Sequence, residues 1–83
     1  FFMYLGYNAP HTPMQAKKSD LEKYHNISNK GRRTYAAMVD SLDQGVGKIR
    51  AYLDQKKLTD NTIILFSSDN GGATCNSSDN GIY

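Results

Sequence analysis

Two adjacent oxygen donors follow an apolar run near the end of the chain. Residues 68–72 read Ser-Asp-Asn-Gly-Gly and come directly after the β-rich run at residues 62–67. Asp69 offers a carboxylate and Asn70 a neutral carbonyl, and hard oxygen ligands of this kind suit a divalent cation such as calcium. A plain turn is the alternative, and the local pattern alone favours it, because Asp-Asn-Gly is also favourable turn chemistry. The same tripeptide at residues 79–81 has no strand-like run before it, and we expect a turn there.

A histidine lies in a loop that two prolines stiffen. Pro10 and Pro13 restrict the residues before them to extended conformations, so His11 lies between two constrained peptide units. An imidazolium at such a position can bind an anion or protonate a leaving oxygen. A solvent-exposed loop histidine is the alternative, and for His11 taken alone it is the commoner case. His25 has no comparable setting and is expected to be a surface residue.

Two apolar runs and a long helix would position these residues. Residues 1–7 (FFMYLGY) and 62–67 (TIILFS) are short and apolar, which predicts strands buried on both faces of a sheet. Between them, apolar residues recur at three- and four-residue steps, which predicts an amphipathic helix over residues 32–57. The residues of this stripe are Tyr35, Met38, Val39, Leu42, Val46, Ile49 and Leu53. Gly45 and Gly47 interrupt the helix, and a close approach of the helix to the sheet would account for them.

A shorter helix is expected before the long one. Ser19 followed by Glu22 fits a capping box, so a helix should run from there to about His25. The stretch after the second apolar run, residues 68–83, is rich in Gly, Asn, Ser and Asp and is expected to form a loop.

The order strand, long helical crossover, strand predicts the fold class. We expect an α/β fold, with the chain forming a βαβ fragment of a mostly parallel sheet flanked by helices. Parallel strands end at the same edge of a sheet, and sites in open α/β sheets form beyond that edge. His11, Asp69 and Asn70 can therefore meet in space, although the whole crossover separates them along the chain.

Composition excludes several classes of protein. The chain has 83 residues, of which 39% are hydrophobic and 22% charged, and its net charge is +2. These values argue against disorder and against nucleic acid or an anionic membrane as a partner. No apolar run approaches the roughly 20 residues of a membrane span. Cys75 is the only cysteine, so it forms neither an internal disulfide nor a zinc site. The chain starts inside an apolar run without Met, and we expect it to be an internal piece of a longer protein.

Taken together, these segments resemble the type I sulfatases (arylsulfatases) of the alkaline phosphatase-like superfamily. Residues 1–16 are similar to that family's strand and loop with a His-x-Pro element, and residues 32–49 to its long helix. Residues 58–72 are similar to its strand that ends in an Asp-Asn-Gly metal loop. The three matches occur in the expected order, and together they favour a metal loop over a plain turn. Residues 1–83 are thus interpreted as part of a sulfatase catalytic domain.

The resemblance implies a sulfuric ester hydrolase. It implies that Asp69 and Asn70 bind a single Ca²⁺ ion whose other ligands lie outside this chain. It also implies that His11 contacts the sulfate ester and can give a proton to the leaving alcohol. The implied nucleophile is a formylglycine made from a Cys/Ser-x-Pro/Ala-x-Arg motif, which the 83 residues lack. Cys75 cannot replace it, and we expect the chain alone to be inactive.

Two alternative functions stay open at this point. One is a phosphate or phosphonate ester hydrolase of the same superfamily, and the other is a non-catalytic sulfatase-like protein that binds sulfated ligands. The nucleophile motif discriminates them, because a sulfatase needs the formylglycine precursor. The resemblance further implies a sulfated small molecule or carbohydrate as the substrate, and an exported protein that is periplasmic, extracellular or lysosomal.

Overall fold

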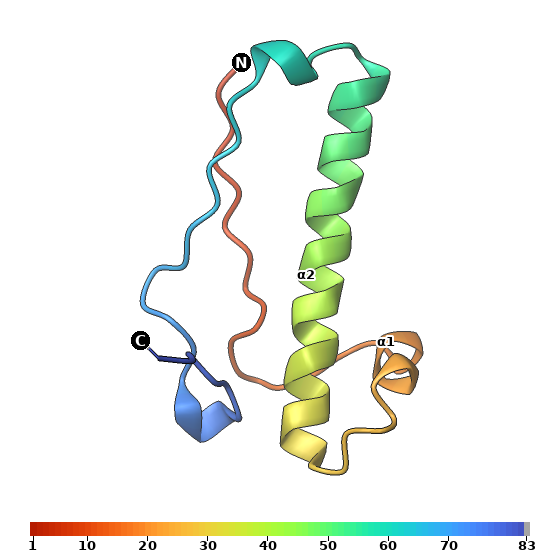
Figure 1. The fold of residues 1–83 in the computed structure, drawn as a ribbon, viewed down its shortest axis with the longest axis vertical. Coiled ribbons are helices and arrows are strands. Elements are labelled where there is room, and N and C mark those ends of the chain that lie inside the picture. Colours follow the sequence, from red (N-terminus) through yellow and green to blue (C-terminus); the bar gives the residue numbers. More distant parts are fainter. Residues whose placement is uncertain (83) are drawn as a thin grey trace.

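A long helix is the central element of the computed structural model, which describes residues 1–82. The elements in chain order are α1 (Lys18–Lys23), α2 (Lys30–Gln55), and the 3₁₀ turns η1 (Thr59–Asn61) and η2 (Thr74–Asn76) (Figure 1). The predicted amphipathic helix is confirmed, although α2 begins and ends two residues earlier than expected. The early start has a local cause, because the Asn29 side chain caps the helix by accepting a 2.9 Å hydrogen bond from the Arg32 backbone N–H.

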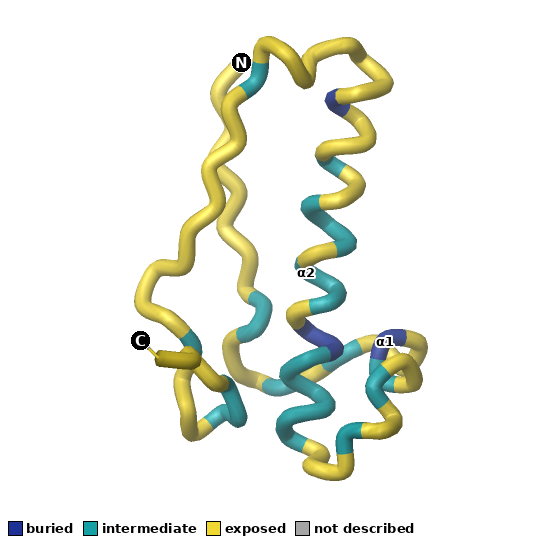
Figure 2. The backbone as a smooth tube through the Cα atoms, in the orientation of Figure 1, coloured by how far each residue is buried: buried dark blue, intermediate teal, exposed yellow. Residues whose placement is uncertain are grey.

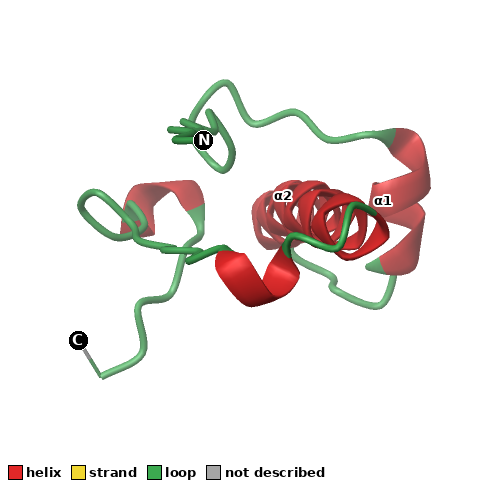
Figure 3. Ribbon diagram, turned by 90° about the horizontal axis from the view of Figure 1, so that it is seen from above, coloured by secondary structure: helices red, strands yellow, loops and turns green. Residues whose placement is uncertain are grey.

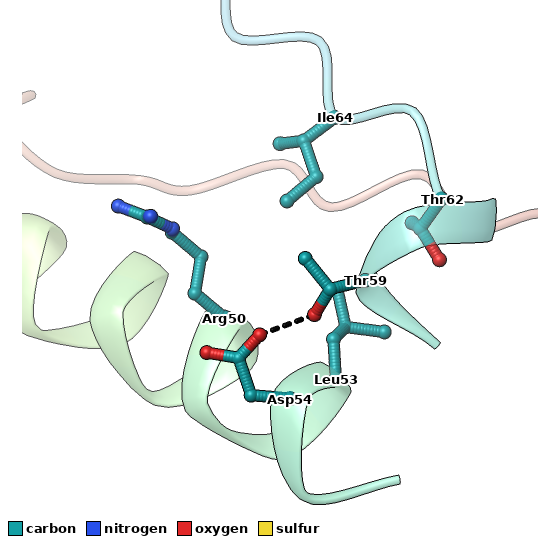
Figure 4. A pocket seen from close by; sticks show the side chains of 6 residues that line it. All are labelled: Arg50, Leu53, Asp54, Thr59, Thr62 and Ile64. Carbon is teal, nitrogen blue, oxygen red and sulfur yellow. Dashed lines mark hydrogen bonds between the residues drawn. The ribbon is translucent and has the colours of Figure 1, made fainter. Parts of the chain in front are cut away.

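The end of α2 reverses the direction of the chain. Lys57 adopts the left-handed conformation with φ of 56°, and the Leu58 N–H donates to the Leu53 carbonyl at 2.9 Å. This is a Schellman motif, which satisfies carbonyls that the helix end leaves free. The Thr59 hydroxyl then donates to the Asp54 carboxylate, as Figure 4 shows. The chain thus leaves α2 in a fixed turn and starts back alongside it.

The two apolar runs are extended, but they are not strands within the part of the chain that the structure describes. Residues 1–7 and 62–67 run in the same direction, opposite to α2, as a βαβ unit would place them (Figure 1). In the view from above, however, the two runs lie apart (Figure 3). The structure therefore does not support the predicted two strands of a parallel sheet within residues 1–82 by themselves. A strand needs ladder hydrogen bonds to a neighbouring backbone, and neither run has such a neighbour within residues 1–82.

Most side chains of the two runs face solvent. Four of them are 87–94% exposed, namely Phe2, Tyr4, Ile63 and Leu65. The buried apolar side chains lie on α2 instead, and they are Ala37, Met38 and Leu53 (Figure 2). Exposed apolar surface of this extent marks a face that another part of a protein covers.

We therefore expect the isolated 83-residue chain to lack a sharp unfolding transition. So small a core contributes too little free energy to offset the conformational entropy of an ordered chain. The exposed apolar runs should also drive self-association. Thermal melts followed by circular dichroism, repeated at several protein concentrations and combined with sedimentation, check this expectation. A steep, concentration-independent melt of a monomer would contradict it.

The short helix α1 exists, but the predicted capping box is wrong. α1 begins at Lys18 with Lys17 as the N-cap residue, and no side chain caps it. Ser19 lies inside the first turn, where its hydroxyl does not meet the free N–H groups as a cap would. α1 ends at Lys23, two residues before the expected end.

A polar network holds α1 against α2. Asp20 of α1 is only 3% exposed, and its Oδ1 accepts a 3.0 Å hydrogen bond from Gln44 Nε2 of α2. The same amide nitrogen lies 2.5 Å from Asp40 Oδ1. Lys23 forms an ion pair with Asp20 at 3.0 Å, and the Tyr24 hydroxyl donates to Asp40 at 2.9 Å. The Gln44 bond, followed by the Lys23 bond, holds the pKa of Asp20 below its ordinary value of 3.8.

This network should make the α1–α2 contact sensitive to acid. The hydrogen bonds from Gln44 and Tyr24 also lower the pKa of Asp40. A carboxyl with a lowered pKa stabilises the folded state fully above its unfolded pKa, here 3.8, and loses this effect as the pH falls through the folded value. Acid should thus release α1 before it unwinds α2.

Hydrogen exchange in the complete protein measures this release. Between about pH 5 and about pH 3, and after correction for intrinsic rates, residues 18–24 should lose protection while residues 46–53 keep theirs. The variant Asp20→Asn has no charge to lose at this position, so its α1 should show a smaller pH effect. Equal protection of α1 at both pH values in the unmodified protein would contradict the expectation.

Candidate functional site

His11 is exposed, in a loop that local hydrogen bonds shape. Its backbone N–H donates to the Asn8 carbonyl at 2.8 Å, which closes the turn. Its ring Nδ1 lies 2.9 Å from the Thr12 carbonyl oxygen and 3.3 Å from the Thr12 hydroxyl. A carbonyl only accepts, so this contact favours the proton on Nδ1. A neutral ring of this tautomer presents Nε2 as an acceptor, and a protonated ring presents it as a donor.

Asp69 and Asn70 also lie exposed, in a loop directly after the second extended run. The Asn70 backbone N–H donates to Asp69 Oδ1 at 2.9 Å, and the Gly71 N–H donates to the Ser68 hydroxyl at 3.0 Å. Gly71 has a positive φ of 74°, which favours glycine at this position. These bonds form a tight turn, so the turn chemistry expected from the sequence is present. A turn and a cation site are compatible, because the turn places the oxygen donors together.

The side-chain amide of Asn70 lies beside the Asp69 carboxylate. One terminal atom of the amide lies 2.8 Å from Asp69 Oδ1 and 3.2 Å from the Gly71 carbonyl oxygen. With nitrogen at this position, the amide donates to both oxygens. The Asn70 oxygen then points away from these two acceptors, so the amide would have to turn over before it could join Asp69 as an oxygen donor. The donor types, one carboxylate and one amide, fit part of a calcium site.

The loop alone does not complete a metal site. Calcium takes about 6–8 oxygen ligands, and Asp69 is the single carboxylate in the turn at residues 68–72. Within residues 1–82, no three His, Cys, Asp or Glu side chains gather closely enough to hold a metal ion. Any bound ion would need further ligands from other parts of a protein.

The two candidate loops follow extended runs that lead toward the same end of the fold. Both runs descend beside α2 in Figure 1, and the loops with His11 and Asp69 come after them. Each loop forms its hydrogen bonds locally or with the loop that follows it, and none of the bonds described above joins His11 to Asp69. The meeting of these two side chains at one rim stays a prediction.

A hydrogen bond from Arg32 holds the segment after the Asp69 loop against the first turns of α2. Asn80 forms a reciprocal pair with Gly72, accepting from its N–H at 2.9 Å and donating to its carbonyl at 2.8 Å. Arg32 reaches across from α2 and donates from Nη1 to the Ser77 carbonyl at 2.8 Å. The Arg32 guanidinium also stacks over the Tyr35 ring, 5.6 Å from its centroid. The helix thereby fixes where the Asp69 loop can lie.

Sequence reasoning missed this anchor. It gave Arg32 no role, and it interpreted residues 79–81 as a simple turn. The turn is there, since Asp79 Oδ1 accepts from the Gly81 N–H at 2.8 Å, but Asn80 has the additional role described above. One signal could have suggested the Arg32 contact. A positive charge near the N-terminus of a helix is unfavourable for the helix dipole, so an arginine at this position indicates a compensating contact.

Comparison with protein families decides the affiliation of the chain. The family model described as Sulfatase matches residues 1–82. The chain belongs to the sulfatase family. This confirms the resemblance that the His-x-Pro element, the long helix and the Asp-Asn-Gly loop indicated. In the described part of this sulfatase chain, no helix is both long and apolar enough to cross a membrane.

Several curated sulfatases are similar to the chain over most of its length. Arylsulfatase J of Mus musculus is 42% identical over 71 residues, covering 86% of this chain and 12% of that protein. The uncharacterized sulfatase YdeN of Escherichia coli (strain K12) is 46% identical over 72 residues, 86% of this chain and 13% of that protein. Human N-acetylgalactosamine-6-sulfatase is 36% identical over 81 residues, 98% of this chain and 14% of that protein. The chain thus spans about an eighth of the length of the relatives it matches.

A solved structure shares the fold of these residues. The protein described as "Crystal structure of Ps i-CgsB" is 51% identical in sequence and superposes with a TM-score of 0.86. The superposition covers 89% of this chain and 16% of the other. The arrangement of α2 with the extended runs beside it is therefore the arrangement found in part of a larger protein.

Proposed function

We propose that this chain is part of a sulfatase that hydrolyses sulfate esters, with His11 acting on the substrate and Asp69 and Asn70 holding Ca²⁺. The match of the sulfatase family model over residues 1–82 carries the proposal. The local structure agrees with it, because an exposed imidazole and two adjacent oxygen donors each follow an extended run. The substrate class is a sulfated small molecule or carbohydrate.

His11 would bind the sulfate group and assist departure of the alcohol. As an imidazolium it donates a hydrogen bond to a sulfate oxygen or a proton to the leaving oxygen. The Nδ1 contact with the Thr12 carbonyl holds the ring and directs this chemistry to Nε2. A ring held in this way loses less conformational entropy when it reaches the reacting geometry. This is the usual benefit of an oriented catalytic group.

Asp69 and Asn70 would supply one charged and one neutral oxygen to the ion. A Ca²⁺ ion held by these two residues would supply positive charge to stabilise negative charge on the sulfate oxygens. The Asn70 amide would have to turn its oxygen toward the ion, because its nitrogen faces Asp69 Oδ1 and the Gly71 carbonyl. The nucleophile would be a formylglycine outside these 83 residues, which contain no Cys/Ser-x-Pro/Ala-x-Arg sequence.

The complete protein would also supply the missing part of the sheet. We propose that residues 1–7 and 62–67 become strands of a mostly parallel sheet there, because their exposed apolar side chains need cover. Residues 1–83 are then part of the catalytic domain. We include export from the cytoplasm in the proposal, on the family resemblance.

Hydrolysis assays of the complete protein test the proposal. With calcium present, the protein should release 4-nitrophenol from 4-nitrophenyl sulfate faster than from 4-nitrophenyl phosphate, and residues 1–83 alone should release none. Faster hydrolysis of the phosphate would favour the phosphohydrolase. Tight binding of a sulfated ligand without turnover of any sulfate ester would favour a non-catalytic sulfatase-like protein.

A further inference from the structure

The loop that carries His11 begins and ends against one turn of α2. At its start, Tyr7 lies against Gly45, where an added Cβ would be 2.5 Å from the Tyr7 hydroxyl and 3.2 Å from its ring carbon Cζ. At its end, Asp20 accepts the 3.0 Å hydrogen bond from Gln44. Gln44 and Gly45 are consecutive residues of α2, so the chain leaves one helix turn at Tyr7 and returns to it at Asp20. Figures 1 and 3 both show the connecting segment passing beside α2.

The contact at Gly45 leaves no room for a Cβ unless the Tyr7 ring moves aside. Of the two glycines inside α2, Gly47 has nothing within 4 Å of an added Cβ, whereas a methyl at Gly45 would collide with Tyr7. A close approach therefore exists at one of them, but the side chain of Tyr7 in the first extended run makes it and not a sheet. A glycine inside a helix is destabilising relative to alanine, and the space for Tyr7 accounts for that cost at Gly45 only.

The contact at Gln44 depends on a hydrogen-bond donor. Its amide nitrogen lies between the Asp20 and Asp40 carboxylates, at 3.0 and 2.5 Å. Lys23 is the cation that meets both of these carboxylates, at 3.0 Å from Asp20 and 3.3 Å from Asp40. A glutamate at position 44 would place a third carboxylate beside this single lysine. A partly buried network of this kind is strong when complete and costly when one member is lost.

We propose that Gln44 and Gly45 are positioning residues that set the place of His11 by holding both ends of its loop on α2. This inference rests on the proposed function for the identity of His11 as the substrate-binding group. Its structural basis is separate, since it needs only the two contacts and the loop between them. Displacing a reacting group by about 1 Å can lower the reaction rate by up to about 10²-fold. A loop that is fixed at both ends therefore supports the rate by keeping His11 in place, in addition to stabilising the fold.

Gly45→Ala and Gly47→Ala form a matched pair of variants in the complete protein. Both replace a glycine inside α2 by alanine, but only the first displaces Tyr7. Gly45→Ala should lower kcat/KM for an aryl sulfate about 10-fold, and Gly47→Ala should leave it unchanged. The double variant Gly45→Ala/Tyr7→Phe, which removes the hydroxyl that collides, should recover part of the loss. Gln44→Ala should act like Gly45→Ala, and Gln44→Glu more strongly.

A second readout does not depend on turnover. The rate at which diethyl pyrocarbonate modifies His11, followed by mass spectrometry, should rise in Gly45→Ala and Gln44→Ala and stay unchanged in Gly47→Ala. Calcium affinity should not change in any of these variants. If Gln44→Ala fails to fold, the comparison of Gly45→Ala with Gly47→Ala and with the double variant Gly45→Ala/Tyr7→Phe still tests the proposal.

Two outcomes separate this inference from the proposed function. The inference is overturned if Gly45→Ala behaves like Gly47→Ala in both His11 modification and kcat/KM. If the complete protein hydrolyses no sulfate ester, the proposed function fails, but a selective rise in His11 modification would still support the positioning of the loop.

Discussion

Asp69→Asn in the complete protein should abolish calcium binding at this site and lower kcat/KM for sulfate esters by about 10²–10³-fold. Asparagine keeps the size of the side chain and an oxygen, so the turn that Asp69 forms with the Asn70 N–H should persist. What is lost is the single negative charge of the 68–72 loop, which a hard cation needs. Calcium titration by calorimetry and steady-state kinetics measure the two effects.

The chain provides a matched control for this variant. Asp79 begins the second Asp-Asn-Gly tripeptide and likewise accepts a backbone hydrogen bond, from Gly81 at 2.8 Å. Asp79→Asn removes one negative charge from a tripeptide of identical sequence that is not proposed to bind calcium. It should therefore leave calcium affinity and kcat/KM almost unchanged. Calcium binding in Asp69→Asn equal to that of the unmodified protein would refute the assignment, as would an equal loss in Asp79→Asn.

His11→Gln should lower kcat by about 10²–10⁴-fold, the usual contribution of a general acid. The loss should depend on the alcohol that leaves. A poor leaving group such as an alkyl alcohol needs the proton more than 4-nitrophenol does, so His11→Gln should affect alkyl sulfates more strongly than 4-nitrophenyl sulfate. Calcium affinity should stay unchanged, since His11 is not expected to be a ligand.

His25→Gln is the control for the histidine. The ring Nδ1 of His25 lies 2.9 Å from the Glu22 carbonyl, much as that of His11 lies near the Thr12 carbonyl, so the two side chains have similar local bonding. His25→Gln should have little effect on kcat. A loss in His11→Gln that is the same for alkyl and aryl sulfates would mean that His11 binds sulfate without protonating the leaving oxygen.

The sequence predicts the helices of this chain better than its strands. α2 follows from a stripe of apolar residues whose period is local, and its hydrogen bonds lie within the helix itself. A strand is different, because its hydrogen bonds need a second backbone that can come from anywhere in a protein. Residues 1–7 and 62–67 have the composition of buried strands, but the partners that would pair with them do not lie within residues 1–82.

The residues of the candidate site also fall into two groups, those that the local sequence indicates and those that it does not. His11, Asp69 and Asn70 could be named as candidates from the sequence because prolines and glycines beside them mark loops, and because the order of the three motifs matches a family. Their anchors were missed, since Arg32 bonds to Ser77 and Gln44 bonds to Asp20, partners that are 45 and 24 positions away. Nothing in the local pattern around Gln44 distinguishes it from a solvent-facing helix residue.

A crystal structure of the complete protein with calcium and a bound sulfate ester tests most directly whether two distant loops form one site. Calcium should lie about 2.3–2.6 Å from oxygens of Asp69 and Asn70, and His11 Nε2 should lie within hydrogen-bond distance of the sulfate group. A calcium ion bound without Asp69, or an imidazole of His11 on the face of the sheet away from that carboxylate, would contradict the shared site.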